Sequence, residues 1–170
     1  MAKQTIGLGT APTGVGGDTP RTAFTKVQAN FDELYAADAV SYKKTNVLGA
    51  TTQSGGVVTG ALFNSGSNAN GFYTFMADGT LICTHRQYVS LALPNVSGAW
   101  YYNLASWIFP TAFVSPPKVH VSSWCAGRVI STGRANEPTS SVGTSFFIIS
   151  SENVPASTFV HEWTAIGRWF

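Results

Sequence analysis

One short segment of the chain carries apolar residues at helical spacing. Four of them follow one another at spacings of 3, 4 and 3: Phe24, Val27, Phe31 and Leu34. This is the a/d pattern of a coiled-coil seam, and Thr19-Pro20 before it supplies a capping hydroxyl and a proline at the first helical position. We predict a coiled-coil helix over residues 19–39, with phenylalanine at two seam positions favouring three strands. The alternative is a helix packed on the β domain of its own chain, because so short a helix is marginal alone in water.

After residue 71 the pattern changes to short apolar runs separated by turn residues. The runs cover residues 72–76, 80–86, 89–93, 100–104, 119–124, 127–130, 145–150 and 159–170. Asp78-Gly79, between the first two runs, is typical of a hairpin turn, and prolines separate several of the others. Short strands at regular intervals indicate an antiparallel sandwich or open barrel. We predict a mainly β protein whose residues 71–170 form an antiparallel β-sandwich knob.

The two remaining segments, residues 1–18 and 40–70, show neither the helical spacing nor the regular short apolar runs. Residues 1–18 contain five glycines and one proline, which predicts an irregular arm that becomes ordered only by lying on another surface. Its glycines do not form the GxxxxGK[ST] pattern of a phosphate-binding loop. Residues 40–70 are rich in Thr, Ser, Gly and Asn and are predicted to be a polar linker with short strands.

Composition points to association with other chains. Charged residues make up 11% of the chain, against 44% hydrophobic and 13% aromatic, and depletion of charge with excess of aromatics marks interface cores. A β-rich monomer with a Ser/Thr surface is the alternative. The net charge of +2 with scattered cations argues against nucleic-acid binding. No apolar run is long enough to cross a bilayer and no signal peptide begins the chain, so we expect no membrane insertion and assembly in a cytoplasm.

The sequence offers little for catalysis or metal binding. The predicted knob has four acids, each isolated in sequence: Asp78, Glu137, Glu152 and Glu162. A glycosidase pair of Glu137 with Glu152 or Glu162 is possible in principle, but turn or surface acids are the simpler interpretation. His85, His120 and His161 lie singly on separate runs, although a histidine near a trimer axis would be repeated three times. Cys83 and Cys125 are expected to be buried and reduced. We predict no enzyme, no cofactor and no metal site.

Aromatic residues are the most distinctive side chains of the knob. Rigid aromatic faces beside Arg, Asn and Ser suit saccharide rings, and they equally suit core or interface packing. The exposed recognition surfaces are expected in residues 95–103 and in the polar loop 131–143. The candidate glycan-recognition residues are Trp100, Tyr101, Tyr102, Arg128 and Arg134.

Two stretches of the chain resemble bacteriophage tail-fibre proteins. The run GDTPRTAFTKVQANFDELY over residues 17–35 looks like the N-terminal motif of many tail fibres and tailspikes, with Gln28 where that motif often has Asn. The later stretch resembles fibre C-terminal domains ending in WxAIG, through ADGTLI (77–82), FPTAF (109–113), PKV (117–119) and WTAIGR (163–168).

The resemblance implies a homotrimer with a coiled-coil start and three β-sandwich domains around an axis. It implies a virion component that contacts other phage tail proteins through residues 1–38. We expect a short tail fibre that binds a bacterial surface polysaccharide or lipopolysaccharide. Because no long shaft separates helix and knob, a structural tail adaptor or plug is the alternative. A polysaccharide depolymerase is a third interpretation.

Overall fold

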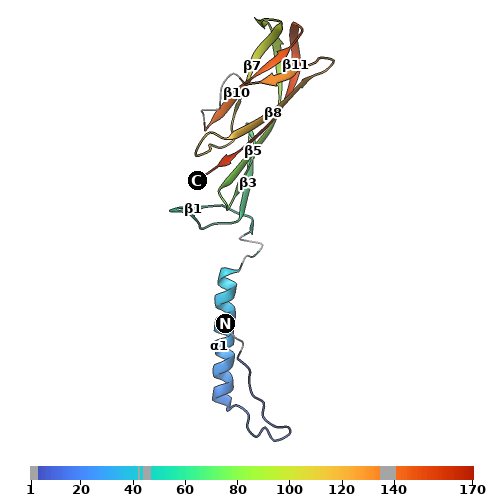
Figure 1. The fold of residues 1–170 in the computed structure, drawn as a ribbon. Helices are drawn as coiled ribbons and strands as arrows, with labels where there is room; N and C mark the ends of the chain where they lie inside the picture. Colours follow the sequence, from blue (N-terminus) through green and yellow to red (C-terminus); the bar gives the residue numbers. More distant parts are fainter. Residues whose placement is uncertain (1–3, 42, 44–46, 135–140) are drawn as a thin grey trace. The chain divides into compact units, whose positions relative to one another are not determined.

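The computed structural model describes residues 4–41, 43, 47–134 and 141–170. The chain divides into two compact units, Met1–Lys43 and Lys44–Phe170, which Figure 1 shows as a helical and a β unit. The protein is mainly β, with antiparallel sheets, as predicted. Each unit is described by itself below.

The helical unit is built on α1, Pro20–Val40. Its start is capped as the sequence predicts, because the Thr19 hydroxyl accepts a hydrogen bond from the Thr22 amide at 3.2 Å and Pro20 occupies the first helical turn. Ser41 has extended backbone and ends the helix. Among the residues that the structure describes, α1 contains no buried side chain.

The glycine-rich arm lies along α1 (Figure 1). Gln4 and Asn30 exchange two hydrogen bonds of 2.9 Å, from the Gln4 amide to Asn30 Oδ1 and from Asn30 Nδ2 to the Gln4 carbonyl. A tight turn follows, in which the Thr10 amide donates to the Val15 carbonyl. Bonds to the helix and bonds within the arm's own turn together satisfy backbone groups of the arm.

The β unit contains three antiparallel sheets within the described residues. The five-stranded sheet comprises, in order, β3 (Phe63–Asn68), β4 (Gly71–Met76), β5 (Thr80–Leu93), β11 (Val154–Arg168) and β8 (Lys118–Cys125). The four-stranded sheet comprises β6 (Asn95–Ser97), β7 (Trp100–Ile108), β10 (Gly143–Ser150) and β9 (Ser131–Gly133). The short strands β1 (Gln53–Ser54) and β2 (Val57–Val58) form a separate pair.

The predicted hairpin joins β4 to β5. The Gly79 amide donates to the Met76 carbonyl, Asp78 Oδ1 accepts from the Thr80 amide, and Gly79 has a φ of +87°. This left-handed conformation explains the Asp-Gly pair, because glycine reaches it without steric cost. The two predicted runs 80–86 and 89–93 are one continuous strand, β5.

The core lies between the two larger sheets and is mainly aromatic. Trp163 of β11 packs edge-on against Phe146 of β10, with ring centroids 4.7 Å apart, and lies 5.5 Å from Trp107 of β7. Side chains from both sheets form one buried cluster: Leu81, Cys83, Leu93, Ala105, Trp107, Phe109, Phe113, Cys125, Phe146, Ile148, Val154, Phe159, Trp163 and Ala165. Every second residue of the central strands therefore faces the other sheet, as in a sandwich.

The motifs that resemble fibre domains contribute to this core. Phe109 and Phe113 of FPTAF are buried with ring centroids 5.1 Å apart. A Cβ at Gly167 of WTAIGR would stand 2.7 Å from Phe113 Cδ1, so glycine permits this close packing. FPTAF and WTAIGR therefore both contribute to the packing of the core.

One further sequence prediction differs from the structure. The strand predicted over 127–130 is wrong: the Arg128 amide donates to the Cys125 carbonyl in a turn, Gly127 has a φ of +71°, and β9 begins at Ser131. The segment 40–70, predicted to be a polar linker with short strands, includes β3, which pairs with β4 from Phe63↔Met76 to Asn68↔Gly71. β3 forms the sheet edge with Ser, Gly and Asn, and such a strand carries little apolar pattern.

Candidate functional site

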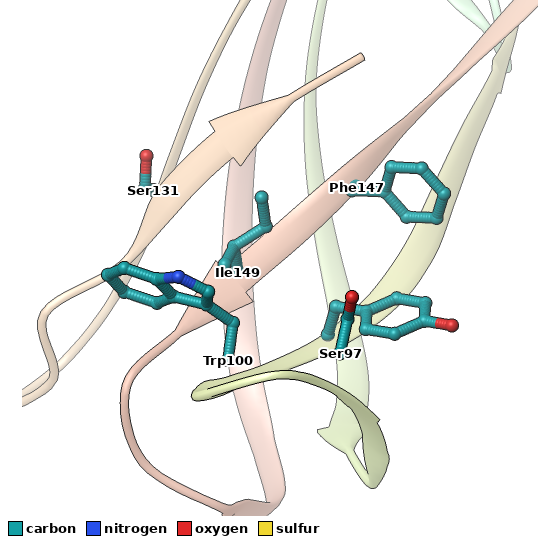
Figure 2. A pocket seen from close by; sticks show the side chains of 6 residues that line it. Ser97, Trp100, Ser131, Phe147 and Ile149 are labelled. Atoms are coloured by element: carbon teal, nitrogen blue, oxygen red, sulfur yellow. The ribbon is translucent and has the colours of Figure 1, made fainter. Parts of the chain in front are cut away.

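A pocket of about 400 Å³ lies on the outer face of the four-stranded sheet. Side chains from all four strands line it: Ser97 from β6, Trp100 and Tyr102 from β7, Phe147 and Ile149 from β10, and Ser131 from β9 (Figure 2). We call this set the Trp100 pocket. Its volume is within the range of small-molecule sites.

Strand pairing explains why these six side chains converge. Ile149 stands opposite Tyr102 of β7 and opposite Ser131 of β9, so the three side chains form one row across the sheet. Trp100 and Phe147 are each two residues from a member of this row, and alternate residues of a strand share a face. Ser97 stands opposite Trp100.

The apolar surface of the pocket is partly open to solvent. The Trp100 side chain is 53% exposed, whereas Tyr102 and Phe147 are half-buried and pack edge to face with centroids 5.2 Å apart. Figure 2 shows the Trp100 indole and the Phe147 ring on either side of Ile149. The arrangement offers aromatic faces to a ligand, with serine hydroxyls on the two outer strands.

Three of the five candidate recognition residues do not line the pocket. Tyr101 packs against the buried core from the opposite face of β7. Arg128 forms an ion pair with Glu152 at 2.7 Å, and Arg134 donates to the Val119 carbonyl at 2.8 Å. Of the predicted set, the structure brings together Trp100 and Tyr102.

Ser97 and Ser131 line the pocket and lie in the predicted recognition segments 95–103 and 131–143, although neither was among the five candidate residues. Phe147 and Ile149 also line it and were not predicted. The run Phe146-Phe147-Ile148-Ile149 carried a usable signal, because a strand that is apolar on both faces indicates that its outer face is also covered or used. The loop 131–143 proves to begin with strand β9, and residues 135–140 of it lie outside the described residues.

The acids of the knob that the structure describes lie apart from this pocket's lining. Glu162 is 3.6 Å from Arg86 on the outer face of β11, Glu152 pairs with Arg128, and Asp78 belongs to the β4–β5 turn. Backbone and side-chain hydrogen bonds from Thr80 hold the pKa of Asp78 below its usual value. Glu137 lies outside the described residues. Within the described ranges, His, Cys, Asp and Glu form no group of three or more that could hold a metal ion.

The histidines and cysteines have structural environments. His161 is fully buried among Phe146, Phe159 and Trp163, and its Nδ1 shares a hydrogen bond of 2.8 Å with the Ser123 hydroxyl. Burial lowers the pKa of His161. Both cysteines are buried and unpaired on strands, as predicted. Burial raises the pKa of the Cys83 thiol to about 11, which makes it a poor nucleophile.

The helical unit presents a second candidate surface, the predicted seam. Phe24 and Phe31 are 72% and 51% exposed, Leu34 is also exposed, and Val27 is half-buried. The arm occupies a neighbouring face of α1, where it bonds to Lys26 and Asn30. Phe24, Phe31 and Leu34 of the seam are thus left uncovered in the helical unit. None of the helices described is long and apolar enough to span a membrane.

Comparisons with known proteins give one distant likeness. No family model matches the chain, and no curated protein matches it. Among solved structures, the chain is similar to an N-truncated R1-type pyocin tail fibre, with 22% sequence identity and a TM-score of 0.42. That similarity covers 63% of this chain and 88% of the pyocin fibre chain.

Proposed function

We propose that this chain is a short trimeric bacteriophage tail-fibre protein. Its helical unit would attach to other tail proteins through residues 1–38, and its β unit would bind a glycan on the surface of the host bacterium. Besides the resemblance of residues 17–35 and of the WTAIGR stretch, two surfaces support the proposal.

The uncovered seam of α1 supports self-association. A stripe of Phe24, Phe31 and Leu34 left in water forgoes the burial of three large apolar side chains, each contributing about 1.5–3 kcal/mol when fully covered. Copies of the same helix would cover the stripe in a parallel coiled coil. The arm would remain on the outside, because it bonds to other helical positions.

The observation that carries the glycan-binding proposal is the Trp100 pocket. It combines a half-exposed indole, two further aromatic rings and two serine hydroxyls on a rigid sheet. Aromatic faces pack against the C–H face of a sugar ring while hydroxyls bond to its edge. A site on strands holds such groups in place more accurately than a loop does.

The test is binding of the full chain to bacteria and to immobilised lipopolysaccharides and capsular polysaccharides from a broad panel of strains. We expect retention on a subset of strains and loss of that retention in Trp100→Ala. Light scattering of the same sample should give a trimeric mass. Absence of binding to every strain and polysaccharide would contradict the receptor-binding role.

The structural adaptor makes a different prediction. A map of the intact particle in which other tail proteins cover the Trp100 pocket would favour the adaptor over the receptor-binding fibre. We propose a non-catalytic protein, since Glu152 and Glu162 each pair with an arginine and neither lines the pocket. Clearing of capsule by the purified chain would overturn that part of the proposal.

A further inference from the structure

The serine hydroxyls of the Trp100 pocket lie on different strands of the sheet from its aromatic and aliphatic side chains. The two central strands contribute three aromatic side chains and Ile149, whereas the two outer strands contribute the hydroxyls of Ser97 and Ser131 (Figure 2). A bound ligand would therefore meet apolar surface over its face and hydrogen-bonding groups at two edges. The Tyr102 hydroxyl and the Trp100 indole N–H are the remaining polar groups of the lining side chains.

Within the described part of the chain, none of the residues that line the pocket is Asp, Glu, Lys, Arg or His. The two arginines that sequence reasoning placed at the site have other partners, Glu152 for Arg128 and the Val119 carbonyl for Arg134. A carboxylate or phosphate entering the pocket would lose hydration without gaining an opposite charge from any of the six described lining residues. Such a loss strongly disfavours binding of a charged group.

The small number of hydroxyls on the lining also limits how polar the ligand is. Each sugar hydroxyl buried against Phe147 or Ile149 without a partner weakens binding by about tenfold or more. A methyl or acetyl group at the same place instead removes apolar surface from water. The pocket therefore favours sugars in which a deoxy carbon or an acetyl methyl replaces a free hydroxyl.

We propose that the Trp100 pocket recognises a neutral deoxy or N-acetylated sugar and discriminates against uronic acids and phosphorylated sugars. The inference rests on the proposed glycan-binding function and specifies its ligand class. Trp100 would stack on the ring, and Ser97 and Ser131 would bond to the hydroxyls at its edges.

The experiment compares matched oligosaccharides on an array probed with the full chain. One set carries neutral 6-deoxyhexose or N-acetylhexosamine residues, and the other carries uronic acids or sugar phosphates in the same linkages. Two variants accompany the native protein: Trp100→Ala, and the control Trp124→Ala. Trp124 is 46% exposed, close to the value for Trp100, and lies on β8 of the other sheet. Thermal unfolding verifies that both variants fold.

We expect the neutral set to bind, with at least tenfold weaker binding in Trp100→Ala and unchanged binding in Trp124→Ala. Binding confined to the acidic set and lost in Trp100→Ala would overturn this inference while leaving the proposed function intact. Binding lost only in Trp124→Ala would overturn the assignment of the site. If the native chain bound neither these sugars nor any bacterial polysaccharide, the proposed function itself would fail.

Discussion

Lys26 Nζ lies 2.7 Å from Asp18 Oδ2 and 2.9 Å from Asp18 Oδ1, so that one ion pair joins the arm to the helix. The same Asp18 Oδ2 accepts a hydrogen bond of 2.7 Å from the Gly7 amide, and Lys26 Nζ also donates to the Thr5 carbonyl at 3.0 Å. The side chains of Lys26 and Asp18 are 28% and 16% exposed to solvent. Most surface ion pairs contribute little, but this one also satisfies backbone groups of the arm.

Asp18→Asn should loosen the arm without unfolding the helix. The amide side chain keeps the shape of the carboxylate but loses its charge, which weakens the bonds from Lys26 and Gly7 together. Hydrogen exchange of the amides in residues 4–17 should accelerate severalfold, while exchange in α1 changes little. Asp32→Asn, which alters an exposed carboxylate on the same helix, is the control. Equal exchange in Asp18→Asn and the native chain would show that Gln4 and Asn30 suffice to hold the arm.

The arm should also respond to pH in a defined direction. The hydrogen bond from Lys26, followed by that from Gly7, lowers the pKa of Asp18 below its usual value of 3.8. The ion pair therefore stabilises the docked arm fully above pH 3.8, and this contribution is lost as pH falls through the lowered pKa. The amide proton shift of Gly7, followed by NMR during acid titration, should stay constant from neutral pH to about 4 and change below it. A change centred near pH 6 would exclude Asp18 as its cause.

Phe31→Asp should weaken assembly of the proposed trimer. In a three-stranded seam the substitution brings three carboxylates together in an apolar core, where their desolvation is unfavourable. Light scattering at micromolar concentration should show a lower mean mass than for the native chain. Ala36→Asp, which places the same charge on a face of α1 away from the seam, should leave the mass unchanged. An unchanged mass in Phe31→Asp would indicate that the helix does not form the seam.

The stability of the β unit should decrease under mildly acidic conditions. His161 is buried in an aromatic environment beside Ser123, and burial lowers its pKa from the ordinary value of 6.5. Because the unfolded chain binds the proton more readily than the folded one, the free energy of unfolding is highest above pH 6.5 and falls as pH decreases toward the lowered pKa. Urea unfolding monitored by tryptophan fluorescence between pH 8 and pH 5 measures this slope.

His161→Gln should reduce the change of the unfolding free energy with pH, because glutamine keeps a polar group near Ser123 but does not titrate between pH 5 and pH 8. The ring centroids of His85 and Trp107 are 6.3 Å apart, and burial lowers the pKa of His85 as well. Some dependence of the unfolding free energy on pH should therefore remain in His161→Gln. His120→Gln, at an exposed position of β8, is the control. An identical slope in His161→Gln and the native protein would show that other groups govern the acid response.

The helix and the sandwich could be predicted because their signals are local. The spacing from Phe24 to Leu34 and the Thr19 cap lie within one segment, and Asp78-Gly79 specifies its turn by backbone conformation alone. The partners of Arg128 and Arg134 could not be predicted, because Glu152 and Val119 are remote in sequence and meet them only after the sheets pair. The face of each aromatic residue in Trp100-Tyr101-Tyr102 was equally ambiguous, since this strand carries aromatic residues on both faces.

Tyr101 and Tyr102 should separate stability from binding. They are neighbours on β7, but Tyr101 packs on the core and Tyr102 lines the Trp100 pocket. Tyr101→Ala should lower the free energy of unfolding by about 1–3 kcal/mol, because it removes a ring from a partly buried packing site. Tyr102→Ala should have a smaller effect on unfolding and weaken saccharide binding about tenfold, since it deletes one wall of the pocket together with the edge-to-face contact to Phe147. Chemical denaturation and saccharide titration of both variants measure the two effects, and the reverse pattern would mean that binding uses the opposite face of β7.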